Sequence, residues 1–105
     1  MAEAAYAFAR HLPSEERFGM KTQMERAAIS VALNIGEGLG RGTDGDLERS
    51  LRIAAGSAAE VEVVIRLASR LHGLSGEAST VRREVTAIRH SLFRFIEVVH
   101  KRRTR

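Results

Sequence analysis

The chain is 105 residues long, carries a formal net charge of +4 and contains no cysteine. This length supports one domain, over residues 1–105, and the lack of cysteine excludes disulfides, zinc–thiolate sites and thiol nucleophiles. A single proline and abundant alanine argue against an all-β domain. No stretch approaches the ~18 apolar residues of a membrane span, and no basic-then-apolar leader opens the chain. We therefore expect an all-helical domain that is soluble, cytoplasmic and without a membrane partner.

Two helices are predicted in the first forty residues. The first runs over about residues 2–12, where apolar residues recur with the spacing of one helix face. The second runs over about residues 20–39 and has apolar residues on more than one face, which predicts a central, heavily covered helix. The glycines that follow are expected to end this helix and to form a flexible turn. They are Gly36, Gly38, Gly40 and Gly42.

Two longer helices are predicted in the rest of the chain. Thr43 begins a capping box, so the third helix should run over about residues 44–72. Gly73 should stop it, and Ser75 should cap a fourth helix over about residues 76–102. Apolar residues in both helices alternate at spacings of four and three, which is typical of a bundle seam. The sequence therefore predicts an antiparallel up-and-down four-helix bundle.

The first predicted helix is much shorter than the others. At ~1.5 Å per residue it spans about 16 Å, against roughly 40 Å for the third and fourth helices. Such a bundle leaves part of an apolar groove uncovered, and an exposed apolar groove usually marks an interaction surface. We expect the chain to form a homo-oligomer, with a second apolar stripe of the third helix as the interface. This stripe consists of Ile53, Val64, Leu67 and Leu71.

Basic residues are concentrated in the last third of the chain. Most of them are Arg, which suits bidentate contact with phosphate. On a helical wheel several lie opposite the apolar stripe of the fourth helix, and cations repeated along a rigid rod favour binding to RNA or DNA phosphates. A solvated face is the alternative, and Glu97 weakens the patch. The candidate nucleic-acid-binding residues are Arg82, Arg83, Arg89, His90, Arg94, Lys101, Arg102, Arg103 and Arg105.

The remaining motifs indicate neither a metal site nor an enzyme. Glu97 and His100 have the Glu-x-x-His spacing of di-iron bundles, but such sites need two copies of the motif facing the core. The glycine-rich turn lacks the Gly-Lys-Ser/Thr of a phosphate cradle, and Asp44 and Asp46 follow it and would repel an anion. No nucleophile–base pair has a revealing spacing. We predict a non-enzymatic protein with no cofactor and no metal.

Polar residues on the second and third helices give two further predictions. One group lies near the connection between the two helices, and we interpret it as a hydrogen-bonded cluster that fixes this corner, with a role as functional ligands as the alternative. Its members are Arg26, Ser30, Asn34, Glu37 and Arg41. The pairs Glu48–Arg52 and Glu62–Arg66 are predicted to lie on the solvent side of the third helix.

Four segments of the chain resemble the sequence patterns of a known family. Residues 12–20 (LPSEERFGM) resemble FP-x-E-E-x-[YF]-G-L, and residues 23–31 (QMERAAISV) resemble Q-[IM]-x-R-A-A-[VI]-S-[IV]. Residues 34–41 (NIGEGLGR) resemble N-I-A-E-G-x-G-R, and residues 51–62 (LRIAAGSAAEVE) resemble L-x-I-A-x-G-S-x-x-E-[LV]-E. The chain is thus similar to the four-helix-bundle proteins encoded in bacterial 23S rRNA intervening sequences, whose relatives include the accessory protein of diversity-generating retroelements.

The resemblance implies a bundle that assembles into a ring, usually a homopentamer, with a basic surface and no catalytic residues. It also implies a link to nucleic acid and to a reverse transcriptase, because the retroelement relatives bind both. This chain departs from the family in two ways. The resemblance implies about another half helix, with a Trp, before the first predicted helix, and the given sequence begins without it; a misassigned start and a truly open groove are the two interpretations. Gly36 also replaces the usual Ala, which should loosen the end of the second helix by ~1 kcal/mol.

These observations lead to one favoured function and two alternatives. The favoured hypothesis is an oligomeric, non-enzymatic bundle that contacts RNA or DNA phosphates through the basic face of its last helix, without reading bases. The alternative is a protein–protein adaptor that docks on a reverse transcriptase or another polymerase, where the basic face meets an acidic partner. A structural bundle whose basic tail is only solvated is the third reading.

Overall fold

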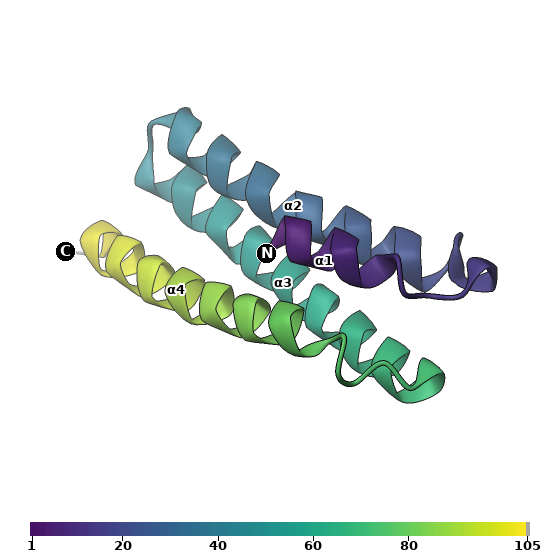
Figure 1. Ribbon diagram of the computed structural model, residues 1–105. Helices are drawn as coiled ribbons and strands as arrows, with labels where there is room; N and C mark the ends of the chain where they lie inside the picture. The colour runs from purple at the N-terminus through teal and green to yellow at the C-terminus, as the bar shows by residue number, and fades with distance from the viewer. Residues whose placement is uncertain (105) are drawn as a thin grey trace.

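Four α-helices and one short 3-10 helix make up most of the computed structural model, which describes residues 1–104 (Figure 1). In chain order the elements are α1 (Ala2–Ala9), η1 (Ser14–Glu16), α2 (Met20–Arg41), α3 (Asp44–His72) and α4 (Ser79–Arg103). Within these residues there is no strand, so the prediction of an all-α fold with four helices is confirmed. None of the described helices combines the length and hydrophobicity that a bilayer span requires.

The ends of α3 lie where the sequence predicts them, because both caps are specific. The side chain of Thr43 accepts a hydrogen bond from the backbone N–H of Asp46 at 3.2 Å, which satisfies one of the free donors of the first turn. At the other end Gly73 has a φ of 66°, in the left-handed region that favours glycine, and its N–H bonds to the Ser69 carbonyl.

The end of α2 differs from the prediction. The helix continues through Gly36, Gly38 and Gly40 to Arg41, and only Gly42, with a φ of 85°, turns the chain toward α3. The expected flexible glycine turn is therefore wrong. Gly38 is buried against α3, and a Cβ built there would lie 2.8 Å from the Cβ of Ser50. Its missing side chain lets α2 approach α3 closely, which offsets the low helix propensity of glycine.

The other helix ends shift by a few residues. The first helix ends at Ala9 and not at residue 12, although Leu12 is still buried in the core. Helix α4 starts at Ser79, because the chain first forms a turn in which the Ala78 N–H bonds to the Leu74 carbonyl at 3.0 Å. Ser75 is therefore not the cap of this helix, and the cap position is taken by Ala78.

All four helices contribute to one apolar core. Helix α3 lies between α2 and α4 (Figure 1), and its residues Leu51, Val61 and Ile65 are completely buried. The expectation that the second helix is the central one is wrong, because Ile29 and Leu33 of α2 are exposed, Leu33 by 65%. The central position belongs to α3, whose side chains face α2 and α4 on both sides.

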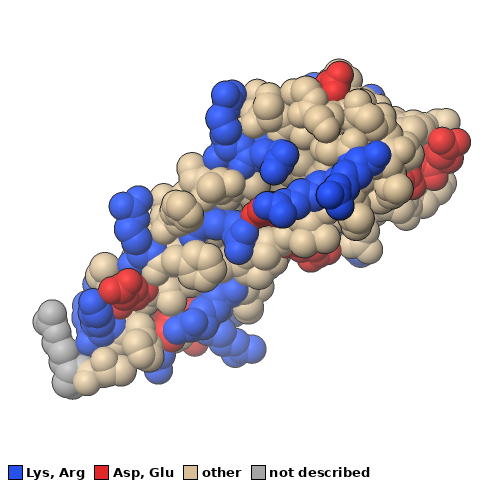
Figure 2. All heavy atoms as spheres, turned by 90° about the horizontal axis from the view of Figure 1, so that it is seen from below, with Lys and Arg blue, Asp and Glu red and all other residues tan. Residues whose placement is uncertain are grey.

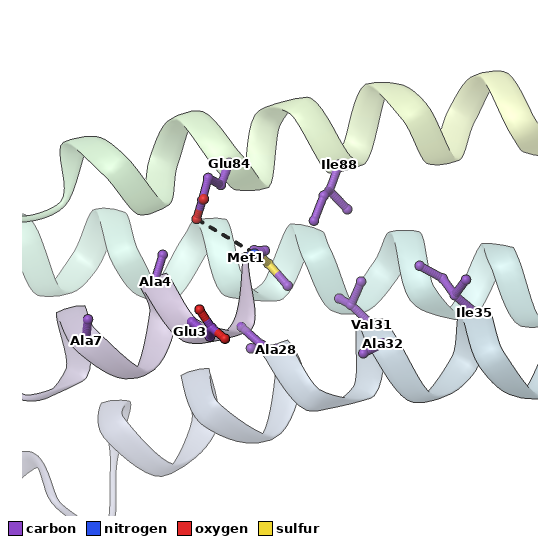
Figure 3. A pocket seen from close by; sticks show the side chains of 11 residues that line it. Met1, Glu3, Ala4, Ala7, Ala28, Val31, Ala32, Ile35, Glu84 and Ile88 are labelled. Carbon is purple, nitrogen blue, oxygen red and sulfur yellow. Dashed lines mark ion pairs between the residues drawn. The ribbon is translucent and has the colours of Figure 1, made fainter.

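Helix α1 covers only part of the groove between α2 and α4. In Figure 1 the N-terminus lies about midway along the bundle. Beside it the groove has an opening lined by residues of α1, α2 and α4. This opening has a volume of about 650 Å³, and Val31, Ile35 and Ile88 contribute to its apolar lining (Figure 3). The Met1 amino group lies 3.7 Å from the Glu84 carboxylate, which ties α1 to α4 at the edge of the groove. The structure thus contains the uncovered groove expected from a short first helix.

Candidate nucleic-acid interface

Basic side chains lie along one long face of the bundle. Figure 2 views the molecule from below the orientation of Figure 1, where α4 lies lowest, and shows Lys and Arg side chains along its length with fewer Asp and Glu between them. The bundle is elongated, with principal extents of 49 × 21 × 17 Å. The cations predicted on the last helix are therefore spread along the molecule and are not gathered at one point.

Four of the predicted residues are exposed and free of acidic partners. Arg82, Arg83, His90 and Arg94 all lie on α4, and none of them forms an ion pair within residues 1–104. Positions 83, 90 and 94 are spaced by seven and four residues, so they share one side of the helix. This side can meet an anion without first breaking a contact inside the protein.

Arg89 has a different environment from its neighbours. It pairs with Glu62 of α3, and its side chain is 32% exposed. Glu62 also accepts a contact from Arg66 at 3.0 Å, so one carboxylate is shared by two guanidinium groups. The Arg89 Nε atom is buried and has no hydrogen-bond partner in the described chain. Arg89 therefore joins α3 to α4 and is only partly accessible to a ligand.

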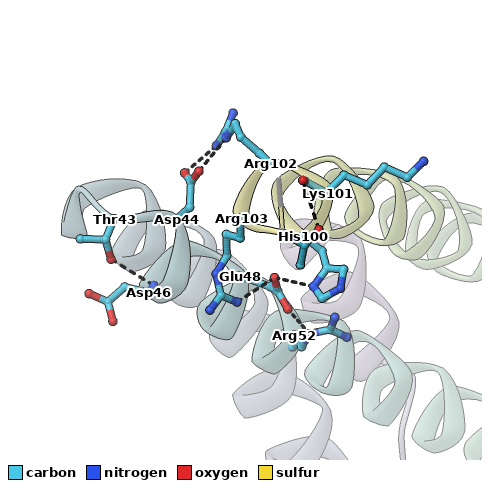
Figure 4. A network of polar contacts seen from close by, with 10 residues as sticks. Thr43, Asp44, Asp46, Glu48, Arg52, His100, Lys101, Arg102 and Arg103 are labelled. Carbon is cyan, nitrogen blue, oxygen red and sulfur yellow. Dashed lines mark hydrogen bonds and ion pairs between the residues drawn. The ribbon is translucent and has the colours of Figure 1, made fainter.

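The predicted cations at the end of α4 are also held by acidic residues (Figure 4). Arg102 donates two hydrogen bonds to Asp44 at the start of α3, both of 2.7 Å. Arg103 donates to Glu48 at 3.0 Å, and Lys101 donates to Glu97 at 2.8 Å. The contacts of Arg102 and Arg103 connect the last turns of α4 to the first turns of α3, whereas the Lys101–Glu97 pair lies within α4. Arg105, the last predicted residue, lies outside the described residues.

Glu48 is the centre of this C-terminal network. It is only 6% exposed, and its carboxylate receives hydrogen bonds from Arg52 and Arg103, both at 3.0 Å, and contacts His100 Nδ1 at 3.1 Å. Burial alone raises the pKa of Glu48, but these three contacts outweigh burial and lower the pKa from 4.5 to about 2. The prediction that Glu48 lies on the solvent side of its helix is wrong, because α4 covers it.

The exposed ion pairs of the network also shift pKa values so that the charged form of each partner is favoured. The hydrogen bonds from Arg102 hold the pKa of Asp44 below its ordinary value, and the same contact raises the pKa of Arg102. The hydrogen bond to Glu97 raises the pKa of Lys101. Each cation thus stays charged, and its charge is compensated inside the protein.

Glu97 and His100 do not converge on a common point. Glu97 binds Lys101, one turn further along α4, and His100 faces Glu48 of α3. Among the residues described, no three His, Asp or Glu side chains are grouped so that they could hold a metal ion. The Glu-x-x-His spacing therefore reflects two separate polar contacts.

The residues predicted to fix the corner form two separate contacts. Asn34 Nδ2 donates to the Ser30 carbonyl at 2.9 Å and to its hydroxyl at 3.1 Å, and Ser30 in turn lies 2.8 Å from the Ser57 hydroxyl of α3. Arg41 donates to Glu37 at 2.6 Å on the exposed side of α2. Arg26 joins neither group: it is exposed and forms no ion pair within the part of the chain described. Only the serine–asparagine group ties α2 to α3.

The apolar stripe predicted as an oligomer interface is mostly on the surface. Ile53, Leu67 and Leu71 are exposed on α3, with Leu71 the most exposed of the three. Val64 is half-buried and packs against the core, so it belongs to the bundle itself. Three of the four residues are thus available to a partner.

Arg70 is a cation that sequence reasoning missed. It lies near the end of α3 and lines a hollow together with Arg66 and Arg82. The four-residue spacing of Arg66 and Arg70 places both on one side of α3. This side faces the start of α4 only because the chain turns back between Gly73 and Ala78, which the spacing within one helix does not reveal.

The fold and the distribution of free cations define an all-α bundle with a partly uncompensated basic face. The chain belongs to the family described as 23S rRNA-intervening sequence protein, whose family model matches residues 1–94. This match includes Arg82, Arg83 and Arg94 and ends before the partnered residues at the end of α4. A comparison with curated proteins finds no match.

Proposed function

We propose that this protein is a non-enzymatic nucleic-acid-binding bundle that holds RNA or DNA by its phosphates. One observation carries the proposal. Arg82, Arg83 and Arg94 are exposed on α4 without an acidic partner in the described chain. The description of the family to which the chain belongs names an intervening sequence of 23S rRNA, and this supports a role connected with RNA.

The spacing of these arginines suits a nucleic-acid strand. Arg83 and Arg94 are eleven residues apart, which is three helical turns and about 16 Å along the axis. This distance is on the order of a few phosphate spacings along a strand. Each guanidinium that replaces a counterion on a phosphate adds affinity that falls with salt and does not depend on the base sequence. The interface should therefore contact the nucleic-acid backbone and make no base-specific contacts.

We also propose that the chain is an antiparallel up-and-down bundle that forms a homo-oligomer, with a ring of five subunits as the expected arrangement. The support is the exposed stripe Ile53, Leu67 and Leu71 on α3. Association would remove these side chains from water and would repeat the basic face around the assembly. The double substitution I53D/L67D should lower the mass measured by light scattering to that of a monomer. A wild-type protein that is already monomeric would contradict this proposal.

Binding is tested by fluorescence anisotropy with a labelled structured RNA and a matched DNA duplex. We expect micromolar or tighter binding at about 50 mM salt and a loss of about 100-fold at about 200 mM. The variant R83E/R94E should bind all probes more weakly by a similar factor and should show a flatter salt dependence. A loss confined to one probe sequence would contradict backbone binding.

The matched control is R17E/R26E. Arg17 lies just before α2 and Arg26 lies within it; both are exposed and form no ion pair within the described residues. This variant therefore changes the net charge by the same amount as R83E/R94E without altering α4. We expect the control to retain most of the affinity. Equal losses of affinity for both variants would mean that the overall net charge, and not the exposed side of α4, determines binding. No binding of RNA or DNA at low salt would overturn the proposal and favour the adaptor on a polymerase.

A further inference from the structure

Two adjoining hollows lie at the corner between α3 and α4. One has a volume of about 410 Å³ and is lined by Arg66, Arg70 and Arg82 with two serines. The other has a volume of about 390 Å³ and is lined by Arg82, Arg83 and the hydroxyl groups of three residues. Arg82 and Ser75 line both hollows, so the two form one continuous basic corner.

The corner differs in charge from three other hollows of the described chain. Neither of its two hollows is lined by a carboxylate, whereas acidic side chains line the groove beside α1 and the hollows near Glu48 and Glu37. Arg70, Arg82 and Arg83 form no ion pair within residues 1–104. Arg66, which also lines the corner, shares the Glu62 carboxylate with Arg89. The corner thus holds a surplus of guanidinium groups.

The start of α4 adds to this positive potential. The cap position is occupied by Ala78, whose side chain accepts no hydrogen bond, and the first turn carries no acidic residue. Glu77 precedes the cap, but no acidic side chain within the first turn offsets the positive end of the helix dipole beside Arg82 and Arg83. By contrast, α3 begins with Thr43 as a cap and has acidic residues in its first turn. An anion at the corner would satisfy both the guanidinium groups and the helix end.

We propose that this corner binds a phosphate monoester at the end of a nucleic-acid strand. This inference rests on the proposed function and specifies it: the exposed side of α4 holds the phosphodiester backbone, and the corner holds the terminal group. A phosphodiester carries one negative charge. A monoester carries close to two at neutral pH, because its second pKa is about 6, and it offers three terminal oxygens. Three unpaired guanidinium groups and the neighbouring hydroxyls match this charge and these acceptors.

The test uses three internally labelled RNA strands of one sequence, about ten nucleotides long so that backbone contacts are few. One strand carries a 5′-phosphate, one a 3′-phosphate, and one has hydroxyl groups at both ends. We expect one phosphorylated strand to bind about 10-fold tighter than the hydroxyl strand at a pH of about 7.5. The preference should shrink at a pH of about 5.5, where the monoester keeps a single charge. Inorganic phosphate should remove the preference before it displaces the strand.

Two variants separate the corner from the backbone interface. R70Q should reduce the preference for the phosphorylated strand, because Arg70 lines the corner and lies outside α4. R94Q is its matched control on the exposed side of α4. It should weaken binding of all three strands by a similar factor and keep the preference for the phosphorylated strand. Arg70 and Arg94 are both exposed, and circular dichroism checks that both variants fold.

The outcomes distinguish the two proposals. Wild-type protein that binds all three strands equally would overturn the terminal-phosphate site and leave backbone binding standing. A preference that survives R70Q unchanged would also overturn the assignment to this corner. Wild-type protein that binds none of the strands, and none of the longer structured probes, would overturn the proposed function and this inference with it.

Discussion

The two ends of α4 carry similar numbers of cations but use them differently. At the start of the helix, Arg82 and Arg83 face hollows without acidic lining, and they have no acidic partner in the described chain. At its end, Arg102 and Arg103 are bound to Asp44 and Glu48 of α3. A count of basic residues therefore does not locate a basic surface. The acidic residues of the neighbouring helix decide which cations remain available.

The helix termini explain why the two ends differ. Asp44 lies in the first turn of α3, where the helix dipole favours negative charge, and the last turn of α4 carries the cations that its own dipole favours. Bringing these two helix ends together compensates both. At the opposite corner the last turns of α3 carry Arg70, and the first turn of α4 contains no acidic residue. Positive charge accumulates there, and a bound anion would relieve it.

The largest expected effect comes from breaking the C-terminal network at its centre. The substitution E48A leaves Arg52, His100 and Arg103 without their shared partner and opens a gap between α3 and α4. We expect the melting temperature to fall on the order of 10 °C, because the substitution removes three contacts of one buried carboxylate at once, two of them to α4. Thermal unfolding followed by circular dichroism measures this. A change of less than about 3 °C would contradict the role of Glu48 in holding the helices together.

Acid should weaken the same end of the helix. The pKa of Glu48 is lowered to about 2 in the folded protein, from 4.5 for an ordinary glutamate. Its ionisation therefore stabilises the fold fully above the ordinary value, and this contribution is lost as the pH falls from about 4.5 toward 2. The melting temperature of the wild type should decline over this range more steeply than that of E48Q. Parallel declines would show that Glu48 does not carry the acid sensitivity.

A moderate effect is expected from increasing the net positive charge near the basic corner. The substitution E62Q removes the carboxylate shared by Arg66 and Arg89. The charge of both guanidinium groups is then no longer compensated, and the surface near the corner becomes more positive. We expect affinity for RNA to rise about threefold at low salt, with a salt dependence steeper by roughly one phosphate contact. Anisotropy titrations at several salt concentrations give both quantities. Unchanged affinity would mean that the ligand lies far from the corner.

The smallest effect is expected from D44N. The Arg102–Asp44 pair is solvated, with side chains that are 50% and 38% exposed, and exposed pairs contribute little to stability. The melting temperature should change by no more than about 3 °C, and RNA affinity should rise by less than about twofold. A large loss of stability would show that this exposed pair, and not Glu48, holds the end of α4.

Much of the fold could be predicted from the sequence because its signals are local. The periodicity of the apolar residues gives the helices, and Thr43 and Gly73 give the ends of α3. The continuation of α2 through its glycines could not be predicted in this way. Gly38 is favoured by its close approach to Ser50, and a contact between two helices is not visible in the pattern of one.

The candidate site was predictable only in part, for the same reason. The helical wheel correctly places Arg83, His90 and Arg94 on the exposed side of α4. It cannot show that Arg102 and Arg103 meet acidic residues more than fifty positions away along the chain. It also cannot show that Arg70 joins Arg82 at the corner. Both facts depend on how α3 and α4 pack against each other.

The most direct test compares neutralised arginines at the two ends of α4. The variants R82Q/R83Q and R102Q/R103Q remove the same charge, and circular dichroism checks that both remain folded. RNA affinity at about 50 mM salt should fall by about 10-fold or more for R82Q/R83Q and by less than about threefold for R102Q/R103Q. Equal losses, or a larger loss for R102Q/R103Q, would contradict the division of α4 into a free and a compensated end.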